Sequence, residues 1–154
     1  MSDNMTKEKR HLCMSHIKGK NTRPEWIVRR FLFHHGFRYR LHDKRIPGSP
    51  DIVLSRYHTV IFVNGCFWHS HDCLHAKLPK TNTDFWEAKM RRNKERDADN
   101  YSKLHSMGWN VIIIWECELK PSKRDETLEN LMSVLNKLIP LTVNVKLFNP
   151  KEDK

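Results

Sequence analysis

The alternation of apolar and polar residues predicts a helix near the start of the chain and a strand directly after it. In the stretch NTRPEWIVRRFLFHHGF, apolar residues recur with the spacing of one helix face, at Ile27, Val28, Phe31 and Leu32. Thr22 can cap this helix, Glu25 completes a capping box three residues later, and Gly36 is a natural stop. The next stretch, FRYRLH, alternates apolar with basic residues, which predicts a half-buried strand with Phe37, Tyr39 and Leu41 facing inward.

Two further strands follow a turn. The stretch DKRIPGSPD has the Pro and Gly content of a turn and ends in Pro50-Asp51. DIVLS and HTVIFVNG then predict two strands with a short turn between them, at residues 51–55 and 58–65. The second of these strands is apolar enough to lie at the centre of a sheet.

The second half of the chain predicts two helices around one strand. Residues 83–108 are long, charged and mostly helical, with Thr83 as the cap, and the pattern leaves open a break near Arg92–Asn93. WNVIIIW, at 109–115, predicts a buried strand by its composition. An amphipathic helix follows over 122–139 and stops at Pro140, and the remaining tail has too weak a pattern to assign.

The order α-β-β-β-α-β-α predicts an α/β fold in which helices flank a mixed central sheet. We therefore divide the chain into a basic N-terminal segment at 1–20, a folded domain at 21–139 and a C-terminal tail at 140–154. At 154 residues the chain is about one domain long, which is enough to bury a core.

The charge of the chain is strongly basic and unevenly distributed. The net charge is +10, and residues 1–50 hold twelve Lys and Arg against four Asp and Glu. A one-sided basic surplus is what phosphate neutralisation on a nucleic acid requires, although a merely soluble basic surface is the alternative. The first twenty residues lack a signal-peptide core, and no run of about 18 apolar residues exists to cross a membrane. Four cysteines without a secretion signal favour a reducing compartment, so we expect the bacterial cytoplasm.

The loop NGCFWHSHDC, residues 64–73, concentrates metal ligands. Cys66, His71 and Cys73 have zinc-type chemistry, and Cys117, just past the last apolar strand, is the best fourth ligand. Three other side chains compete for the same role, namely His69, Asp72 and His75. A closed Cys₃His set would make the zinc structural, and buried cysteines without a metal are the alternative. Cys13 is isolated and predicts a free thiol.

Two acids and one histidine are candidates for catalysis. Asp51 starts a strand after a proline, where a carboxylate can hold a divalent cation or simply cap the turn. The second acid and lysine of many nuclease sites are missing from the next strand. His69 is the candidate general acid or base, since imidazole titrates near neutral pH. For Glu25, the capping box is already a sufficient explanation.

Four stretches together resemble one family. IPGSPD, VIFVNGCFWHSHDC, TDFWEAKMRRNKERD and LHSMGWNVIIIWECEL occur in the order and spacing of the very-short-patch-repair (Vsr) mismatch endonucleases, and the resemblance runs from about Met14 to Leu119. It implies a restriction-endonuclease-like fold with a structural zinc. It also implies an enzyme that nicks DNA beside the T:G mismatch left when 5-methylcytosine deaminates.

The resemblance implies roles for the catalytic candidates. Asp51 matches the Mg²⁺-binding aspartate, and Val63 stands where the family uses a backbone carbonyl as a second Mg²⁺ ligand, which accounts for the missing acid. His69 matches the histidine that activates water, and Glu25 a helix glutamate near the active site. Asn64 departs from the family, because the best-studied type has a histidine there and asparagine cannot carry a proton.

The resemblance also implies the zinc set and the DNA contacts. Cys66, His71, Cys73 and Cys117 match the zinc ligands, in agreement with their spacing. The aromatics that wedge into the base stack match Phe67, Trp68 and Trp86, with Met14 entering from the minor-groove side; ordinary core packing is the alternative for these aromatics. Separately from the resemblance, the basic surplus of the first third of the chain predicts phosphate contacts, with Arg23, Arg29, Arg38 and Arg40 as examples.

Partners and rival functions follow from the same reasoning. The expected substrate is double-stranded DNA with a T:G mismatch, and a monomer suits so asymmetric a lesion. A cognate cytosine methyltransferase and mismatch-repair proteins are the partners that such an enzyme implies. One rival is a zinc-stabilised module that binds mismatched DNA without catalysis. The other is a related nuclease with a different mismatch or strand specificity.

Overall fold

A mixed four-stranded sheet forms the centre of the structure, a computed structural model that describes residues 6–8, 21–69, 71, 73 and 77–138. The strands lie in the order of the chain, as β1 (Arg40–Leu41), β2 (Ile52–Leu54), β3 (Thr59–Asn64) and β4 (Asn110–Trp115). The first three pair antiparallel, whereas β3 and β4 run parallel. The predicted mixed α/β architecture is therefore confirmed.

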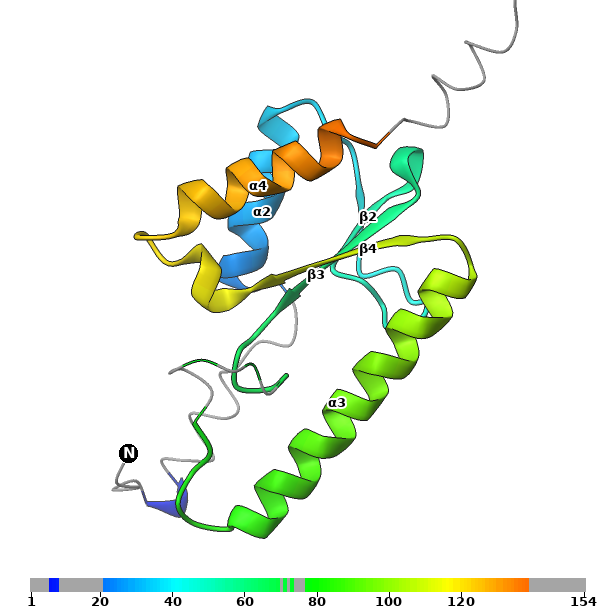
Figure 1. Cartoon of the computed structure of the whole chain (residues 1–154). Coiled ribbons are helices and arrows are strands. Elements are labelled where there is room, and N and C mark those ends of the chain that lie inside the picture. The colour runs from blue at the N-terminus through cyan, green and yellow to red at the C-terminus, as the bar shows by residue number, and fades with distance from the viewer. Residues whose placement is uncertain (1–5, 9–20, 70, 72, 74–76, 139–154) are drawn as a thin grey trace, which may run out of the picture.

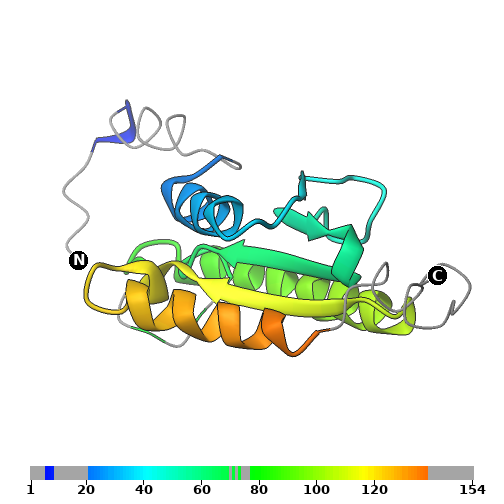
Figure 2. The same ribbon diagram turned by 90° about the horizontal axis from the view of Figure 1, so that it is seen from above.

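Helices cover both faces of this sheet. Figures 1 and 2 show α2 (Arg23–His34) and α4 (Arg124–Asn136) on one side, and α3 (Thr83–Ser106) on the other. The strict alternation of strand side chains explains how β3 supports both layers. Ile61 and Val63 pack with α2 and α4, while Val60 and Phe62 pack towards Leu104 of α3.

The first strand is shorter than the sequence predicts. Only Arg40–Leu41 pair with β2, and Leu41 is 40% exposed, so its predicted inward orientation is wrong. The strand ends because His42 adopts a left-handed backbone conformation with φ of +47°. Phe37 and Tyr39 do reach the core, but from the loop before the strand.

Helix α3 is continuous and exposed over most of its length. It runs through Arg92–Asn93 without the break that the sequence left open, and it buries only Met90 and Leu104. Thr83 is not its cap, because Asn82 takes that position and the Thr83 hydroxyl donates to the carbonyl of Lys80 instead. No helix in the described part of the chain is long and apolar enough to cross a membrane.

The last strand and the last helix are close to their predictions. In β4 only Ile114 is fully buried, because this strand has one neighbour in the described sheet instead of two. Between β4 and α4 lies a short 3-10 helix, η3 (Glu116–Leu119). Pro140, the tail, Cys13 and Met14 lie outside the described residues.

Candidate active site and metal centre

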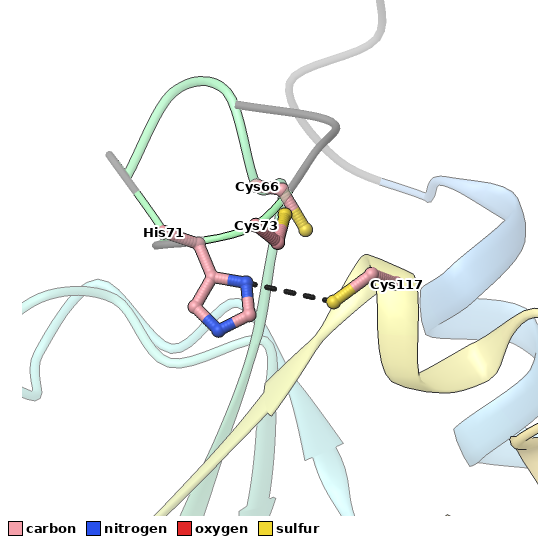
Figure 3. Close-up of side chains that lie close together, drawn as sticks. All are labelled: Cys66, His71, Cys73 and Cys117. Carbon is pink, nitrogen blue, oxygen red and sulfur yellow. Dashed lines mark hydrogen bonds between the residues drawn. The ribbon is translucent and has the colours of Figure 1, made fainter. Parts of the chain in front are cut away.

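Four metal-type ligands converge from two distant parts of the chain. Cys66, His71 and Cys73 come from the loop after β3, and Cys117 comes from η3 after β4. Because β3 and β4 are parallel, the segments that leave them meet at the same sheet edge (Figure 3). The four ligand atoms lie within 4.8 Å of one another, so the structure brings Cys117 to the loop as the sequence predicts.

The chemistry of this cluster fits a zinc ion. The three thiols form no disulfide, and the Cys117 sulfur lies 3.5 Å from Nδ1 of His71. Burial raises the pKa of both Cys66 and Cys117, which favours the neutral thiols. A bound cation would be needed to stabilise the two as neighbouring thiolates. Three sulfurs and one imidazole are a structural zinc set. Of the competing ligands, His69 points to another partner, and Asp72 and His75 lie outside the described residues.

Asp51 lies directly before β2, with its carboxylate against β3. Its Oδ2 accepts a hydrogen bond of 2.7 Å from the backbone N–H of Val63. The pKa of Asp51 is raised to about 6, above all because burial removes water, with a further contribution from the charge of Glu25. A carboxylate in this condition gains strongly from a bound cation, and the Val63 N–H is the backbone group that the structure places against it.

His69 is held by an acid that the sequence reasoning missed. Its Nδ1 lies 2.5 Å from Oδ2 of Asp97, which projects from α3. Asp97 and Asp99 look alike in the run ERDAD, but the side chain of Asp97 is 16% exposed and that of Asp99 is 63% exposed. A carboxylate on one imidazole nitrogen fixes the ring and leaves the other nitrogen to act on a substrate.

Glu25 is buried beneath the site and only partly follows the capping-box prediction. Thr22 Oγ1 accepts from the N–H of Glu25, but the Glu25 carboxylate accepts from the N–H of Asn21. Its strongest partner is Arg29 at 2.7 Å. Arg29 is itself only 2% exposed, and its guanidinium is paired with Glu25 inside the domain. The prediction that Arg29 contacts DNA phosphate is therefore wrong. Arg23, Arg38 and Arg40 are exposed, as their predicted role requires.

His42 is a second residue that the sequence did not single out. It follows β1, and its ring lies between the two acids of the site. Nε2 is 3.2 Å from Oε2 of Glu25, and Nδ1 is 3.6 Å from Oδ1 of Asp51. The sequence pattern placed His42 at a strand end without any motif, so only the pairing of β1 with β2 reveals its position.

Asn64 takes the place of the family histidine at the end of β3. It is buried, and its side-chain amide donates to the hydroxyl of Tyr101 on α3 at 3.0 Å. The pKa of Tyr101 is raised, first by burial and then by the charges of Asp97 and Asp51. Asn64 and Tyr101 therefore belong to the same polar cluster as Asp51 and Asp97.

An aromatic cluster stands outside both buried cores. Phe67 lies 5.0 Å from Trp68 and 5.4 Å from Trp86, between ring centroids. Phe85, which the sequence reasoning did not select, extends the cluster and is 55% exposed. The ammonium group of Lys89 lies over Trp68 at 5.2 Å. None of these rings is part of either buried core of the described residues, which disfavours ordinary core packing.

The fold and the site define an α/β protein that carries a candidate hydrolytic site beside a candidate zinc centre. Comparison with known proteins gives the family. The family model for DNA mismatch endonuclease Vsr matches residues 2–75. The chain is 53% identical over 120 residues to the type II nicking enzyme V.NmeAIP of Neisseria meningitidis serogroup A, which covers 78% of this chain and 86% of that protein. It is also 40% identical over 130 residues to the DNA mismatch endonuclease Vsr of Escherichia coli, covering 83% of each chain.

A further relative is the type II nicking enzyme V.XorIIP of Xanthomonas oryzae, which is 44% identical over 119 residues, 77% of this chain and 88% of that protein. The chain belongs to the DNA mismatch endonuclease Vsr family, and its enzyme class is that of a DNA endonuclease.

Proposed function

We propose that this protein nicks one DNA strand 5′ of the thymine in a T:G mismatch, by Mg²⁺-dependent hydrolysis of a single phosphodiester bond. The observation that carries the proposal is that two catalytic-type side chains lie near each other at the same end of the central strands. One is the desolvated carboxylate of Asp51, and the other is a histidine, His69, oriented by Asp97. The mismatch and strand preference rest on the family resemblance.

Each residue then has a definite task. Asp51 and the carbonyl of Val63 would hold Mg²⁺, which would supply stabilisation of negative charge on the phosphate oxygens. The Nε2 atom of His69 accepts the proton of the attacking water, while its Nδ1 remains bonded to Asp97. Glu25 supports the site from below through its contacts with Arg29 and His42.

The zinc loop and the aromatic cluster have the task of opening the base stack at the mismatch beside this site. Cys66, His71, Cys73 and Cys117 would hold a zinc ion, which would fix the loop on both sides of Phe67 and Trp68. Prying a mismatch open costs a few kcal/mol of unstacking, so an apolar wedge needs a rigid mount. Phe67, Trp68 and Trp86 are the wedge, and Met14, outside the described residues, is proposed to approach from the minor groove.

A strand-labelled duplex panel tests this function. Duplexes with one T:G, A:C or G:G mismatch, or none, are placed in randomised flanks and incubated with the zinc-loaded protein and Mg²⁺. We expect a nick 5′ of the mispaired thymine in the T:G duplex alone. Equal cleavage of the perfectly paired duplex, or cuts in both strands, would contradict the proposal.

One observation favours a related function in second place. Several relatives are named type II nicking enzymes, a name that gives no mismatch. The same panel distinguishes this alternative, because a nicking enzyme of different specificity cuts another duplex in a single strand. A mismatch-binding module without catalysis would shift the T:G duplex in a gel and leave both strands intact. We further propose a cytoplasmic monomer that acts beside a cytosine methyltransferase and mismatch-repair proteins.

A further inference from the structure

Helix α3 presents a row of polar side chains to the candidate active site. Asn93, Asp97 and Tyr101 follow one another at intervals of four residues, so they share one face of the helix. Asn93 donates to the backbone carbonyl of Trp68 at 3.0 Å. Asp97 holds the imidazole of His69 at Nδ1. The third member of the row, Tyr101, has no task in the proposed function.

The hydroxyl of Tyr101 is held by Asn64, the last residue of β3. The side-chain amide of Asn64 donates to the phenol oxygen at 3.0 Å, and Asn64 is only 4% exposed. The ring of Tyr101 packs edge-on against Phe62, with 5.2 Å between the ring centroids. Both contacts come from the central strand, so the ring and its hydroxyl are fixed against the sheet.

This hydroxyl still has a hydrogen to donate. A tyrosine hydroxyl carries one hydrogen and can also accept, and the bond from Asn64 uses it only as an acceptor. Among the residues that the structure describes, the phenol hydrogen has no acceptor within hydrogen-bond distance. Tyr101 is half-buried, so a substrate that enters the site can reach this donor.

The surroundings keep the phenol neutral. Burial raises the pKa of Tyr101, the bond from Asn64 lowers it, and the charges of Asp97 and Asp51 raise it again. Because the ordinary value is already about 10, the hydroxyl keeps its hydrogen at neutral pH. The two carboxylates act on the hydroxyl because it lies near both of them. Its free donor therefore faces the region between the histidine held by Asp97 and the candidate cation ligand Asp51.

We propose that the Tyr101 hydroxyl donates a hydrogen bond to a non-bridging oxygen of the scissile phosphate, with Asn64 as the positioning residue that orients it. A fixed donor stabilises the negative charge that develops on the phosphate in the transition state, without rearrangement when that charge appears. The pair also accounts for the departure at position 64, because asparagine carries no proton but orients a phenol that offers one hydrogen. This inference rests on the proposed function, since it takes the scissile phosphate to lie against Asp51 and His69.

Single-turnover nicking of a strand-labelled T:G duplex by Tyr101→Phe tests the donor. We expect the rate to fall about a hundredfold, while duplex binding by anisotropy and Mn²⁺ binding by calorimetry stay unchanged. Tyr57→Phe is the matched control and should nick like wild type, because Tyr57 is also half-buried but lies in η1 (Ser55–Tyr57), at the opposite end of β3. A wild-type rate in Tyr101→Phe would overturn the proposal. So would a loss of Mn²⁺ affinity as large as the loss of rate.

Sulfur-substituted duplexes identify the atom that the hydroxyl contacts. Two duplexes carry sulfur at one or the other non-bridging position of the scissile phosphate, and Mn²⁺ replaces Mg²⁺ because it tolerates sulfur as a ligand. For one of the two duplexes we expect wild type to slow about tenfold, the size of one hydrogen bond to a charged group. Tyr101→Phe should not slow further on that duplex, since its contact is already lost. Equal slowing of both proteins on both duplexes would contradict the assignment.

Asn64→Leu tests the positioning role. It removes the amide but nearly keeps the size of the buried side chain, and we expect a nicking rate about tenfold below wild type in protein shown to be folded by urea unfolding. Combined with Tyr101→Phe, it should add little further loss, because both changes remove the same interaction. Fully multiplicative losses would show that Asn64 does not act through Tyr101.

Asp51→Asn separates this inference from the proposed function. If wild type nicks with Mg²⁺, Asp51→Asn does not, and Tyr101→Phe nicks like wild type, the proposed function stands and only the role of Tyr101 fails. If wild type leaves the T:G duplex intact, the proposed function fails, and this inference fails with it.

Discussion

The pair formed by His69 and Asp97 is the most specific piece of chemistry in the site. A carboxylate bonded to Nδ1 selects the tautomer whose Nε2 can accept a proton, and it stabilises the ring after the proton has been taken up. Removing the negative charge while keeping the shape of the side chain therefore affects catalysis more than folding.

Asp97→Asn is expected to lower the single-turnover nicking rate about ten- to a hundredfold, because the amide neither stabilises the protonated ring nor fixes the tautomer. Binding of the mismatched duplex should be unchanged. Asp99→Asn, two residues away on the exposed face of α3, is the matched control and should nick like wild type. Equal rates for the two variants would exclude the orienting role of Asp97.

The carboxylate of Asp51 makes the stability of the cation-free protein depend on pH. Its pKa is about 6 in the folded chain against an ordinary value of 3.8, so the folded state retains a proton that the unfolded chain has lost. Stability contributed by the protonated form therefore falls as pH rises from about 4 to about 6, and it stays lost above that window.

Asp51→Asn removes this penalty. In urea unfolding of zinc-loaded protein without Mg²⁺, we expect the variant to be more stable than wild type by about 1–3 kcal/mol at about pH 7.5. The difference should shrink at about pH 5 and on addition of Mg²⁺, which stabilises only wild type. A wild type that is the more stable of the two at the higher pH would contradict the burial argument.

How far the sequence predicts the site depends on whether a residue lies in a recognisable motif. Cys66, His71 and Cys73 share one short loop, and Cys117 follows a predicted strand, so their convergence could be predicted. Asp97 and His42 could not be predicted in this way. Asp97 differs from its neighbours only by the face of α3 on which it lies, and His42 reaches Asp51 only through the register of β1 with β2.

Among the elements, the loop between β3 and α3 depends most on the candidate zinc centre. None of its described residues belongs to either buried core, and its three ligand residues approach Cys117 on η3. A metal bound there is expected to contribute directly to the free energy of folding.

Cys117→Ser should therefore release the zinc and lower the thermal unfolding midpoint. Metal analysis of wild type should give about one zinc per chain, and the variant should hold much less, because a structural site needs all four ligands. Cys13→Ser, which changes the predicted free thiol, is the control and should keep its zinc. Full zinc content in Cys117→Ser would remove Cys117 from the ligand set.

The aromatic cluster joins this loop to the start of α3, and Trp68 lies at the junction. Its backbone carbonyl accepts from Asn93 at 3.0 Å, and its ring lies under Lys89. Both contacts hold Trp68 against α3.

Trp68→Ala is expected to weaken binding of the T:G duplex by about 1–3 kcal/mol, the usual cost of losing one base stack, with a smaller effect on the paired duplex. Fluorescence anisotropy with labelled DNA measures both affinities. Phe33→Ala, on the exposed face of α2, is the matched control. An equal loss on paired and mismatched DNA would show that the ring serves general affinity and not the lesion.

The helices and central strands were predictable because their patterns are long and periodic. The helix predicted over residues 83–108 is observed as α3 at Thr83–Ser106, and the strand predicted from HTVIFVNG is observed as β3 at Thr59–Asn64. The ends were less predictable: the cap of α3 is Asn82 in a left-handed conformation, and β1 is cut short by the positive φ of His42. Such backbone conformations depend on tertiary contacts that no local pattern contains.

At the scale of the whole molecule, the candidate functional residues lie at one end of the sheet, where β3 and β4 finish and β2 begins. The parallel pairing of β3 with β4 brings the Cys/His loop to η3, and the antiparallel pairing of β2 with β3 brings Asp51 to Val63. Helix α3, which lies between the two parallel strands in the chain, supplies Asp97 to the candidate site and Trp86 to the aromatic cluster. The candidate hydrolytic site, the candidate zinc centre and the aromatic cluster therefore lie close to one another.

The most direct test of this account is the Mg²⁺ dependence of nicking by wild type, Asp51→Asn and Asp99→Asn on one strand-labelled T:G duplex. We expect a nick 5′ of the thymine for wild type and for Asp99→Asn, absent without Mg²⁺, and a rate at least about a hundredfold lower for Asp51→Asn. A wild-type protein that binds this duplex tightly but leaves it intact at every Mg²⁺ concentration would contradict the account. So would an Asp51→Asn variant that nicks at the wild-type rate.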